Sequence, residues 1–286
     1  AADPLWAEVR RAGRNGDAGS LVDDFVNRAD LDPAHARWSF HRDIGGSRLV
    51  VLDTRAGRML DEGDRRMLDD AEMAWLEAMA VGGLDHVVVA SSLPFLLPMG
   101  LHHLEAWDEA VAGGAWGARA ARLAEKVRQG VDLEHWAAFQ KSFQRLGRLA
   151  LSLARGERGD PPATVTFLGG DVHHSYLAEA QSRTPARILQ VVCSPIRNPL
   201  PRVVRFASAV AAYGLAWPMG KLAARSARVA DPPFRWTLTD GPWFENVVAT
   251  LDLDGRRSRV HWHTAEPPAR EHGDPRLVTL RSATLS

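Results

Sequence analysis

The sequence ATVTFLGGDVHHSYLAEA, residues 163–180, contains two apolar runs separated by Gly169-Gly170-Asp171-Val172-His173-His174. Short apolar runs next to glycines are typical of buried strands. Two consecutive glycines let the backbone turn sharply and leave room beside the main chain. The stretch therefore predicts two strands of an α/β sheet joined by a short polar segment.

Asp171 and His173 are the first candidate site residues in this segment. If the backbone is extended after Gly170, residues i and i+2 point to the same side. One carboxylate oxygen and one imidazole nitrogen then face a single point, as a metal-ligand pair does. The alternative is a tight turn in which both side chains hydrogen-bond to nearby backbone. The spacing alone does not separate these two interpretations.

The composition excludes several classes of protein. With 286 residues, 45% of them apolar, the chain can bury a sizeable core, and one large α/β domain with insertions is favoured. The 35 basic and 35 acidic side chains cancel, so no global field attracts nucleic acid or anionic lipid. A single cysteine, Cys193, excludes an internal disulfide framework and a cysteine-rich zinc site.

The localisation stays open at this stage. No apolar segment of about 18 residues and no signal-peptide pattern occurs, which predicts a soluble protein without a membrane span. The first residue is Ala1 and not Met, so an incomplete N-terminus is expected. Both a cytoplasmic and an exported protein fit these observations.

Several apolar runs end abruptly at polar residues. The pattern strand, helix (64–80), strand predicts a right-handed parallel crossover. Parallel strands end at one edge of a sheet, where α/β proteins bind ligands. We therefore expect the polar residues that follow these runs to cluster at one edge: Asp53, Arg55, Ser91, Ser92, Asp171 and Cys193.

The rest of the chain is arranged around this sheet. Residues 1–36 are interpreted as a peripheral lead-in, 37–264 as the domain and 265–286 as a C-terminal tail. Two helical insertions are expected at about 98–155, with a helix over 132–154 capped by Asp132, and at 199–232. The second insertion is interpreted as a lid over a pocket, with an interfacial membrane helix as the alternative. Other runs predict a hairpin, 38–42 with 47–53, and an antiparallel meander, 234–239, 244–253 and 257–263.

Five motifs at these strand ends resemble, in order, the second half of the PhoD-like (alkaline phosphatase D) metallophosphatases. They are Val51-Leu52-Asp53-Thr54-Arg55, Val88-Val89-Ala90-Ser91-Ser92-Leu93-Pro94, the Gly169 to His174 segment, Cys193-Ser194-Pro195-Ile196-Arg197-Asn198 and Gly241-Pro242-Trp243-Phe244-Glu245-Asn246. The match runs from about Trp38 to His263. The resemblance implies the calcineurin-like metallophosphoesterase architecture, a four-layer α/β/β/α sandwich with mixed sheets.

The resemblance also implies a function. It predicts metal-dependent hydrolysis of a small phosphoester, with two metal ions (iron, calcium, manganese or zinc) at the strand ends and Asp171 and His173 as ligands. Guanidinium groups fit phosphate oxygens bidentately, so Arg55 and Arg197 are candidate phosphate-binding residues. For both arginines the alternative is a structural ion pair, such as one between Arg55 and Asp53 or another acid. His174 is a candidate proton donor or second ligand, or else a structural residue, and Ser91 and Asn198 are candidates for substrate binding.

The chain departs from the family pattern in one respect. The family's Trp-Asp-Asp-His type segment has no counterpart in residues 1–37. A dinuclear centre takes about four to six donors per ion, whereas Asp171 and His173 supply two in total. We expect a partial chain that lacks the N-terminal ligands and has weak activity; the alternative is a catalytically inactive binding or scaffolding module.

Two rival sites were weighed against this interpretation. A serine hydrolase needs a nucleophile elbow, and no Gly-x-Ser-x-Gly occurs in the sequence. His261 and His263 are expected on one strand face, where a mononuclear metal site is the alternative to an ordinary strand surface.

Overall fold

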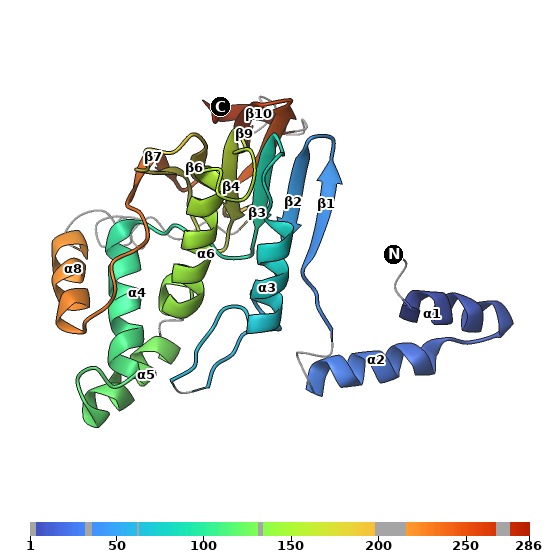
Figure 1. Cartoon of the computed structure of the whole chain (residues 1–286), viewed down its shortest axis with the longest axis horizontal. Helices are drawn as coiled ribbons and strands as arrows, with labels where there is room; N and C mark the ends of the chain where they lie inside the picture. The colour runs from blue at the N-terminus through green and yellow to red at the C-terminus, as the bar shows by residue number, and fades with distance from the viewer. Residues whose placement is uncertain (1–3, 32–35, 62, 131–133, 198–215, 267–274) are drawn as a thin grey trace. The chain divides into compact units, whose positions relative to one another are not determined.

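The computed structural model describes residues 4–31, 36–61, 63–130, 134–197, 216–266 and 275–286 (Figure 1). The chain divides into two compact units, 1–38 and 39–286. The first unit contains helices α1 (Pro4–Asn15) and α2 (Gly19–Leu31). Its Phe25 and Trp38 rings meet edge to face at 6.0 Å. This unit covers the residues interpreted as a peripheral lead-in.

The second unit is built on a seven-stranded mixed sheet of order β1-β2-β3-β4-β6-β5-β7. Strands β2, β3, β4 and β6 are parallel to one another, and β1, β5 and β7 are antiparallel to their neighbours. The α/β class and the parallel crossover are therefore confirmed. The strands are β1 (Phe40–Ile44), β2 (Ser47–Val51), β3 (His86–Ala90), β4 (Thr164–Gly169), β5 (Ser175–Ala180), β6 (Arg187–Val192) and β7 (Trp236–Trp243).

The predicted hairpin is confirmed as the β1–β2 pair. Phe40 pairs with Val51 and Ile44 with Ser47, so the turn consists of two glycines. Gly45 has φ +58°, in the left-handed region where a residue without Cβ is favoured. The turn therefore fixes the register of this edge of the sheet.

Helices α3 (Asp70–Met79) and α6 (Gln140–Ala154) cover one face of the sheet and build the main core (Figure 1). Both begin later than predicted. Asp69 caps α3, since its side chain accepts a hydrogen bond from the Glu72 N–H at 2.7 Å. Before α6 the chain makes a 3₁₀ turn, η2 (Trp136–Ala138), and Phe139 at φ −132° separates the two. The expected cap Asp132 lies outside the described residues.

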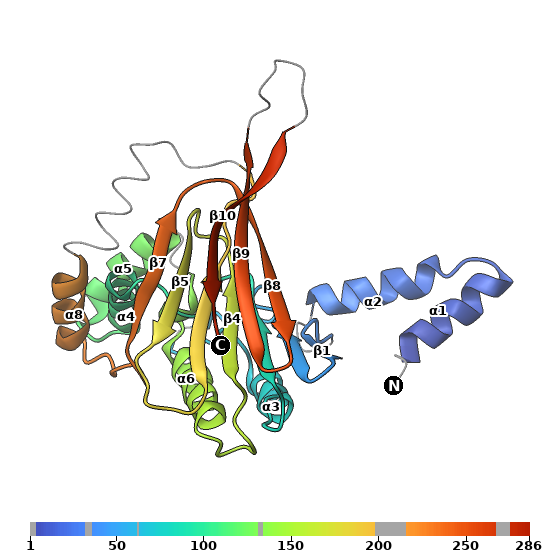
Figure 2. The ribbon, with the colours of Figure 1, turned by 90° about the horizontal axis from the view of Figure 1, so that it is seen from above.

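A three-stranded antiparallel sheet covers the opposite face of the large sheet (Figure 2). It consists of β8 (Val247–Asp254), β9 (Arg257–Glu266) and β10 (Arg276–Thr284). Its side chains Val260 and Trp262 pack on Leu189 and Val191 of the large sheet. The Trp262 indole also donates to the Val192 carbonyl at 3.0 Å. This second core joins the two sheets.

Two sequence-based expectations about this region are wrong. The three runs do not form one meander, because β7 pairs with β5 in the large sheet, while β8 and β9 pair in the small one. The Trp236 indole is buried in the main core, and this burial keeps β7 on the large sheet. The residues interpreted as a tail contain β10, which pairs along β9.

The layers in the described part of this unit are helices, a seven-stranded mixed sheet and a three-stranded sheet. The resemblance implied that both sheets are mixed. The second sheet is instead entirely antiparallel in the described part. Helices α4 (Met99–Ala112), α5 (Ala118–Gly130) and α8 (Ala216–Ser226) gather beside the β7 edge (Figures 1 and 2). Most of the expected lid, residues 199–215, lies outside the described part. None of the described helices is long and apolar enough to cross a bilayer.

Candidate active site

The polar ends of four parallel strands meet at one edge of the sheet, as predicted. Along this edge Val51 pairs with Ala90, Ala90 with Leu168, and Leu168 with Val191. The residues that follow these strands are in contact. The Thr54 and Ser92 hydroxyl oxygens lie 2.7 Å apart, the Gly170 N–H donates to the Ser92 carbonyl at 3.1 Å, and the Cys193 N–H donates to the Gly169 carbonyl at 3.1 Å.

The backbone from Asp171 to His173 is not extended, so that part of the prediction is wrong. Asp171 has φ +61° and His173 has φ +55°, both left-handed. Aspartate and histidine adopt this conformation more readily than most residues. A Cβ on Gly169 would lie 2.8 Å from the Pro94 Cα, so the close packing at the end of β4 requires a glycine at this position. The bend matches the tight-turn alternative for the backbone.

Asp171 forms an ion pair with Arg55. The Arg55 Nη2 lies 2.5 Å from Asp171 Oδ2, and both side chains are about half exposed. The Asp53 carboxylate holds the Arg55 segment in place, because it accepts the N–H groups of Arg55 at 2.9 Å and Ala56 at 3.0 Å. Asp53, which follows β2, thus positions Arg55, and the Arg55 guanidinium reaches Asp171 after β4.

Asp171, His173 and Arg197 line one cleft of about 490 Å³. The His173 N–H donates to the Ser194 hydroxyl at 3.2 Å, which ties the bend to the segment after β6. The other wall of the cleft is largely apolar and includes Ile196 and Val248, both exposed. Asn198 lies outside the described residues. The cleft therefore brings together three of the residues that the motifs singled out.

His174 is buried beneath the surface and does not line this cleft. Its side chain is buried, and its ring lies 5.4 Å from Tyr176 and 5.8 Å from Phe244. Its Nδ1 lies 2.6 Å from the Val172 carbonyl oxygen. Burial lowers the pKa of His174 to about 4, so the ring is neutral near pH 7. These surroundings are those of a structural histidine.

The Ser91 hydroxyl is bonded within the protein. It donates to the Leu93 carbonyl at 2.5 Å and accepts from the Trp136 indole at 3.3 Å. Its neighbour Ser92 is the exposed serine at the strand edge. The two serines therefore differ in what they offer to a ligand.

Three residues near this edge were not predicted from the sequence: Glu105, Glu134 and His135. Glu134 pairs with Arg58 and, at 3.5 Å, with Arg55. The His135 Nδ1 lies 2.7 Å from the carboxylate of Glu105, which is buried in α4. Burial lowers the pKa of His135, but the Glu105 carboxylate outweighs it and raises that pKa above its ordinary value. No local pattern marks this pair, since thirty residues separate its members.

Two metal ions need more donors than the described residues of the cleft supply. Asp171 and His173 offer one carboxylate and one imidazole at the cleft, and Arg55 occupies Oδ2 of Asp171. Among the residues that the structure describes, no group of three or more His, Cys, Asp or Glu side chains is placed to hold a metal ion. The described residues thus fit one end of a metal site and do not complete a dinuclear one.

Comparisons with known proteins add no assignment: no protein-family model and no curated protein matches this chain.

Proposed function

We propose that the protein is a metal-dependent phosphoester hydrolase that acts on a small phosphoester at the cleft beside Asp171. One observation carries the proposal: Asp171, His173 and Arg197 line the same cleft at the carboxyl edge of the parallel strands. This edge is the usual ligand-binding position in α/β sheets. A carboxylate, an imidazole and a guanidinium are the groups that metal-assisted phosphoester chemistry requires.

Each residue has a distinct task in this proposal. Asp171 and His173 would hold a metal ion, and further donors are needed beyond these two. When bound, the metal polarises the phosphoryl group and lowers the pKa of its water. Arg197 would bind phosphate oxygens, and Arg55 would orient the Asp171 carboxylate through its ion pair. The two oxygens of Asp171 could thereby serve different partners.

His135 replaces His174 as the proton donor in this proposal. His174 is buried and neutral, whereas the Glu105 carboxylate favours the protonated form of His135. The departing alcohol needs a proton, and a histidine whose pKa is raised holds its proton to a higher pH than an ordinary histidine does. The Asp171 carboxylate also raises the pKa of His135.

The second candidate function is a catalytically inactive module that binds phosphorylated ligands. The Arg55–Asp171 pair favours it, because an acid already neutralised by an arginine attracts a cation less strongly. In such a module the phosphate would bind to Arg197 without a metal ion. The two candidates therefore differ in their need for metal.

Hydrolysis assays test the proposal. We would measure release of p-nitrophenol from p-nitrophenyl phosphate and from bis(p-nitrophenyl) phosphate, with manganese, zinc, calcium or ferrous ions added in turn. We expect slow, metal-dependent turnover that falls at least about tenfold in Asp171→Asn and in His173→Ala. The matched control is Asp252→Asn, an exposed acid on β8, which should keep the wild-type rate.

The outcomes separate the two candidates. Metal-independent binding of inorganic phosphate, lost in Arg197→Gln and accompanied by no turnover, would support the inactive module. Turnover that is equal in wild type and Asp171→Asn would show that the cleft is not the catalytic site.

A further inference from the structure

Helices α5 and α8 concentrate positive charge in a chain that is neutral overall. The whole sequence carries 35 basic and 35 acidic side chains. Residues 113–130 and 216–230, which contain α5 and α8, carry one acidic side chain, Glu125, and seven basic ones: Arg119, Arg122, Lys126, Arg128, Lys221, Arg225 and Arg228. This region therefore attracts anions locally, although the whole chain does not.

The outer face of α5 combines apolar and basic side chains. Leu123 is 65% exposed and Val127 is 44% exposed, and their i, i+4 spacing places them on one side of the helix. Arg119 lies one turn before Leu123 and Lys126 lies one turn after it, and both are exposed. Ala124, on the opposite side, is buried against α4. The apolar and basic side chains therefore share one exposed face.

Helix α8 also has an exposed apolar face. Met219 is 67% exposed and Leu222 is 71% exposed, and their i, i+3 spacing places them on one side of the helix. Arg225, three residues after Leu222, is exposed beside them. The sequence of α8 contains no acidic side chain. Both helices thus offer exposed apolar groups next to a cation.

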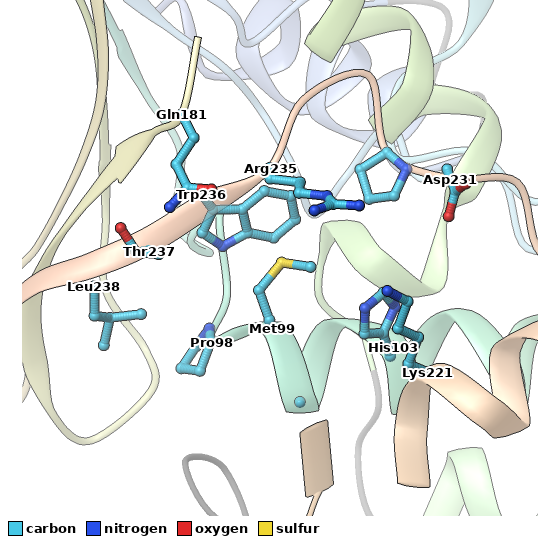
Figure 3. A pocket seen from close by; sticks show the side chains of 12 residues that line it. Pro98, Met99, His103, Gln181, Lys221, Asp231, Arg235, Trp236, Thr237 and Leu238 are labelled. Carbon is cyan, nitrogen blue, oxygen red and sulfur yellow. The ribbon is translucent and has the colours of Figure 1, made fainter. Parts of the chain in front are cut away.

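The opposite side of α8 is packed on α4, so the apolar face points outward. Gly220 is buried, and a Cβ at this position would lie 3.2 Å from the Gly100 carbonyl oxygen. Lys221 lies on this inner side, where it borders a cavity of about 500 Å³ together with His103 (Figure 3). Lys221 is therefore not part of the outer face.

Trp116, in the connection between α4 and α5, joins the two outer faces. Its indole N–H donates to the Ser226 carbonyl at the end of α8 at 3.4 Å, and its ring lies 5.3 Å from the Trp107 ring. The residue is nevertheless 49% exposed. Just beyond α8, Ala227 packs in one cluster with Ala124 of α5, which holds the two helices together. The exposed groups of α5 and α8 therefore form one surface.

The cations of this surface are not neutralised within the described part of the protein. Its five basic side chains are exposed and form no ion pair with a described acid: Arg119, Arg122, Lys126, Arg225 and Arg228. The acid Glu125 is already paired, with Arg128 at 2.9 Å and with Arg65. We call these five residues, together with five apolar ones, the α5–α8 surface; the apolar ones are Trp116, Leu123, Val127, Met219 and Leu222.

We propose that the α5–α8 surface binds an anionic lipid bilayer, with its apolar side chains among the headgroups and its cations on lipid phosphates. Exposed apolar patches mark sites of association, and cations beside them match the negative surface of such a bilayer. A nucleic acid would use the cations but would gain little from Leu123, Met219 and Leu222. Contact with the interface does not require a helix that crosses the bilayer. The proposal does not depend on the hydrolase function.

The test is cosedimentation of the 286-residue chain with vesicles of phosphatidylcholine that contain about 30% phosphatidylglycerol. We expect binding at about 0.1 M salt that weakens at least about tenfold at about 0.5 M salt, because salt screens the attraction. Vesicles of pure phosphatidylcholine should bind at least about tenfold more weakly, because they carry no net negative charge.

Two double variants separate the apolar and the electrostatic contributions. Leu123→Ser with Leu222→Ser should weaken binding about tenfold, because two side chains no longer enter the headgroup region. Arg119→Gln with Arg225→Gln should weaken it at least about tenfold and flatten its salt dependence. Circular dichroism of each variant checks that it is folded.

Matched controls use groups of the same kind elsewhere in the chain. Arg276→Gln with Leu277→Ser replaces an exposed arginine and an exposed leucine on β10, and should keep wild-type binding. Brominated phosphatidylcholine quenches indoles that reach the bilayer. The quenching should fall in Trp116→Phe and stay unchanged in Trp6→Phe, an exposed residue of α1.

Three outcomes would overturn the proposal. The first is equal binding to pure phosphatidylcholine, or binding that survives both double variants. The second is binding to a DNA duplex that is tighter than to the vesicles and unchanged by Leu123→Ser with Leu222→Ser, which would assign the surface to nucleic acid. The third is a dimer in analytical ultracentrifugation that dissociates in this apolar variant, because a second copy would then cover the surface.

Discussion

Two histidine pairs, His173–His174 and His261–His263, lie in contrasting surroundings. On β9, His261 and His263 share one face, with ring centroids 6.1 Å apart, as strand alternation predicts. Neighbouring strands supply their partners: the His261 Nδ1 lies 2.6 Å from the Ser282 hydroxyl, and the His263 Nε2 lies 3.2 Å from the Thr250 hydroxyl. After β4, the bend exposes His173 and buries its neighbour His174.

The difference shows what a regular strand does to its polar side chains. A strand inside a sheet places each residue beside fixed partners, which satisfy its hydrogen bonds. A segment that has just left the sheet has no such fixed partners, so the local backbone conformation decides which of its side chains are exposed and which are buried. His173 is therefore available to a ligand, whereas His261 and His263 are already bonded to protein groups.

The largest effect on stability is expected from removing the buried His174 imidazole. We expect His174→Ala to lower the free energy of unfolding by about 2–4 kcal/mol, because it leaves a cavity beside Tyr176 and Phe244. His173→Ala, with an exposed side chain, should change it by less than about 0.5 kcal/mol. Urea unfolding followed by circular dichroism measures both. If both variants lost the same free energy of unfolding, His173 and His174 would not differ in burial as described.

The second prediction concerns pH. The pKa of His174 falls from 6.5 to about 4 on folding, and that of His102, fully buried, falls to about 3. Above pH 6.5 both rings are neutral in both states, so their contribution is complete. Below pH 6.5 the unfolded chain binds protons that the folded chain excludes, and stability is lost as the pH falls toward 4. His174 alone accounts for about 3 kcal/mol of this loss.

A matched pair of variants isolates the His174 contribution. Urea unfolding at several pH values between 7 and 4 should show a shallower decline in His174→Gln than in wild type, by up to about 1.4 kcal/mol per pH unit. His263→Gln, whose ring is partly exposed on β9, should keep the wild-type slope. An unchanged slope in His174→Gln would mean that this ring titrates normally in the folded protein.

The smallest effect should have opposite signs in the two pairs. His173 has φ +55°, where a side chain is strained, so His173→Gly should be neutral or stabilise the fold by up to about 1 kcal/mol. His263 lies within β9, where glycine loses more backbone entropy, so His263→Gly should destabilise by about 1 kcal/mol. Thermal unfolding of both variants decides this. A loss in both would mean that the bend after β4 is not left-handed at His173.

Much of the sheet could be predicted from sequence because its signals are local. The Gly45-Gly46 turn specified the first hairpin, and apolar runs that stop at Asp53 and Ser91 indicated a shared parallel edge. The placement of β7 was missed because it depends on Trp236 entering a core formed by distant residues. No pattern within the β7 sequence shows whether this strand pairs with β5 or with β8.

The site was predictable in its members and not in its geometry. The motifs identified Asp171 and His173, but the left-handed φ angles of both residues differ from the extended backbone that the strand pattern predicted. The same limit applies to His135, whose protonation depends on Glu105 in another helix. Contacts between distant segments set pKa values of this kind, which local patterns leave open.

The most direct test of the account is to locate a bound metal ion. Crystals of the 286-residue chain soaked in manganese, measured for anomalous scattering, give the position of the ion without reference to activity. We expect a peak about 2.2 Å from both the Asp171 carboxylate and the His173 imidazole. A peak at His261 and His263, or none at Asp171 while Arg55 keeps its ion pair, would contradict it.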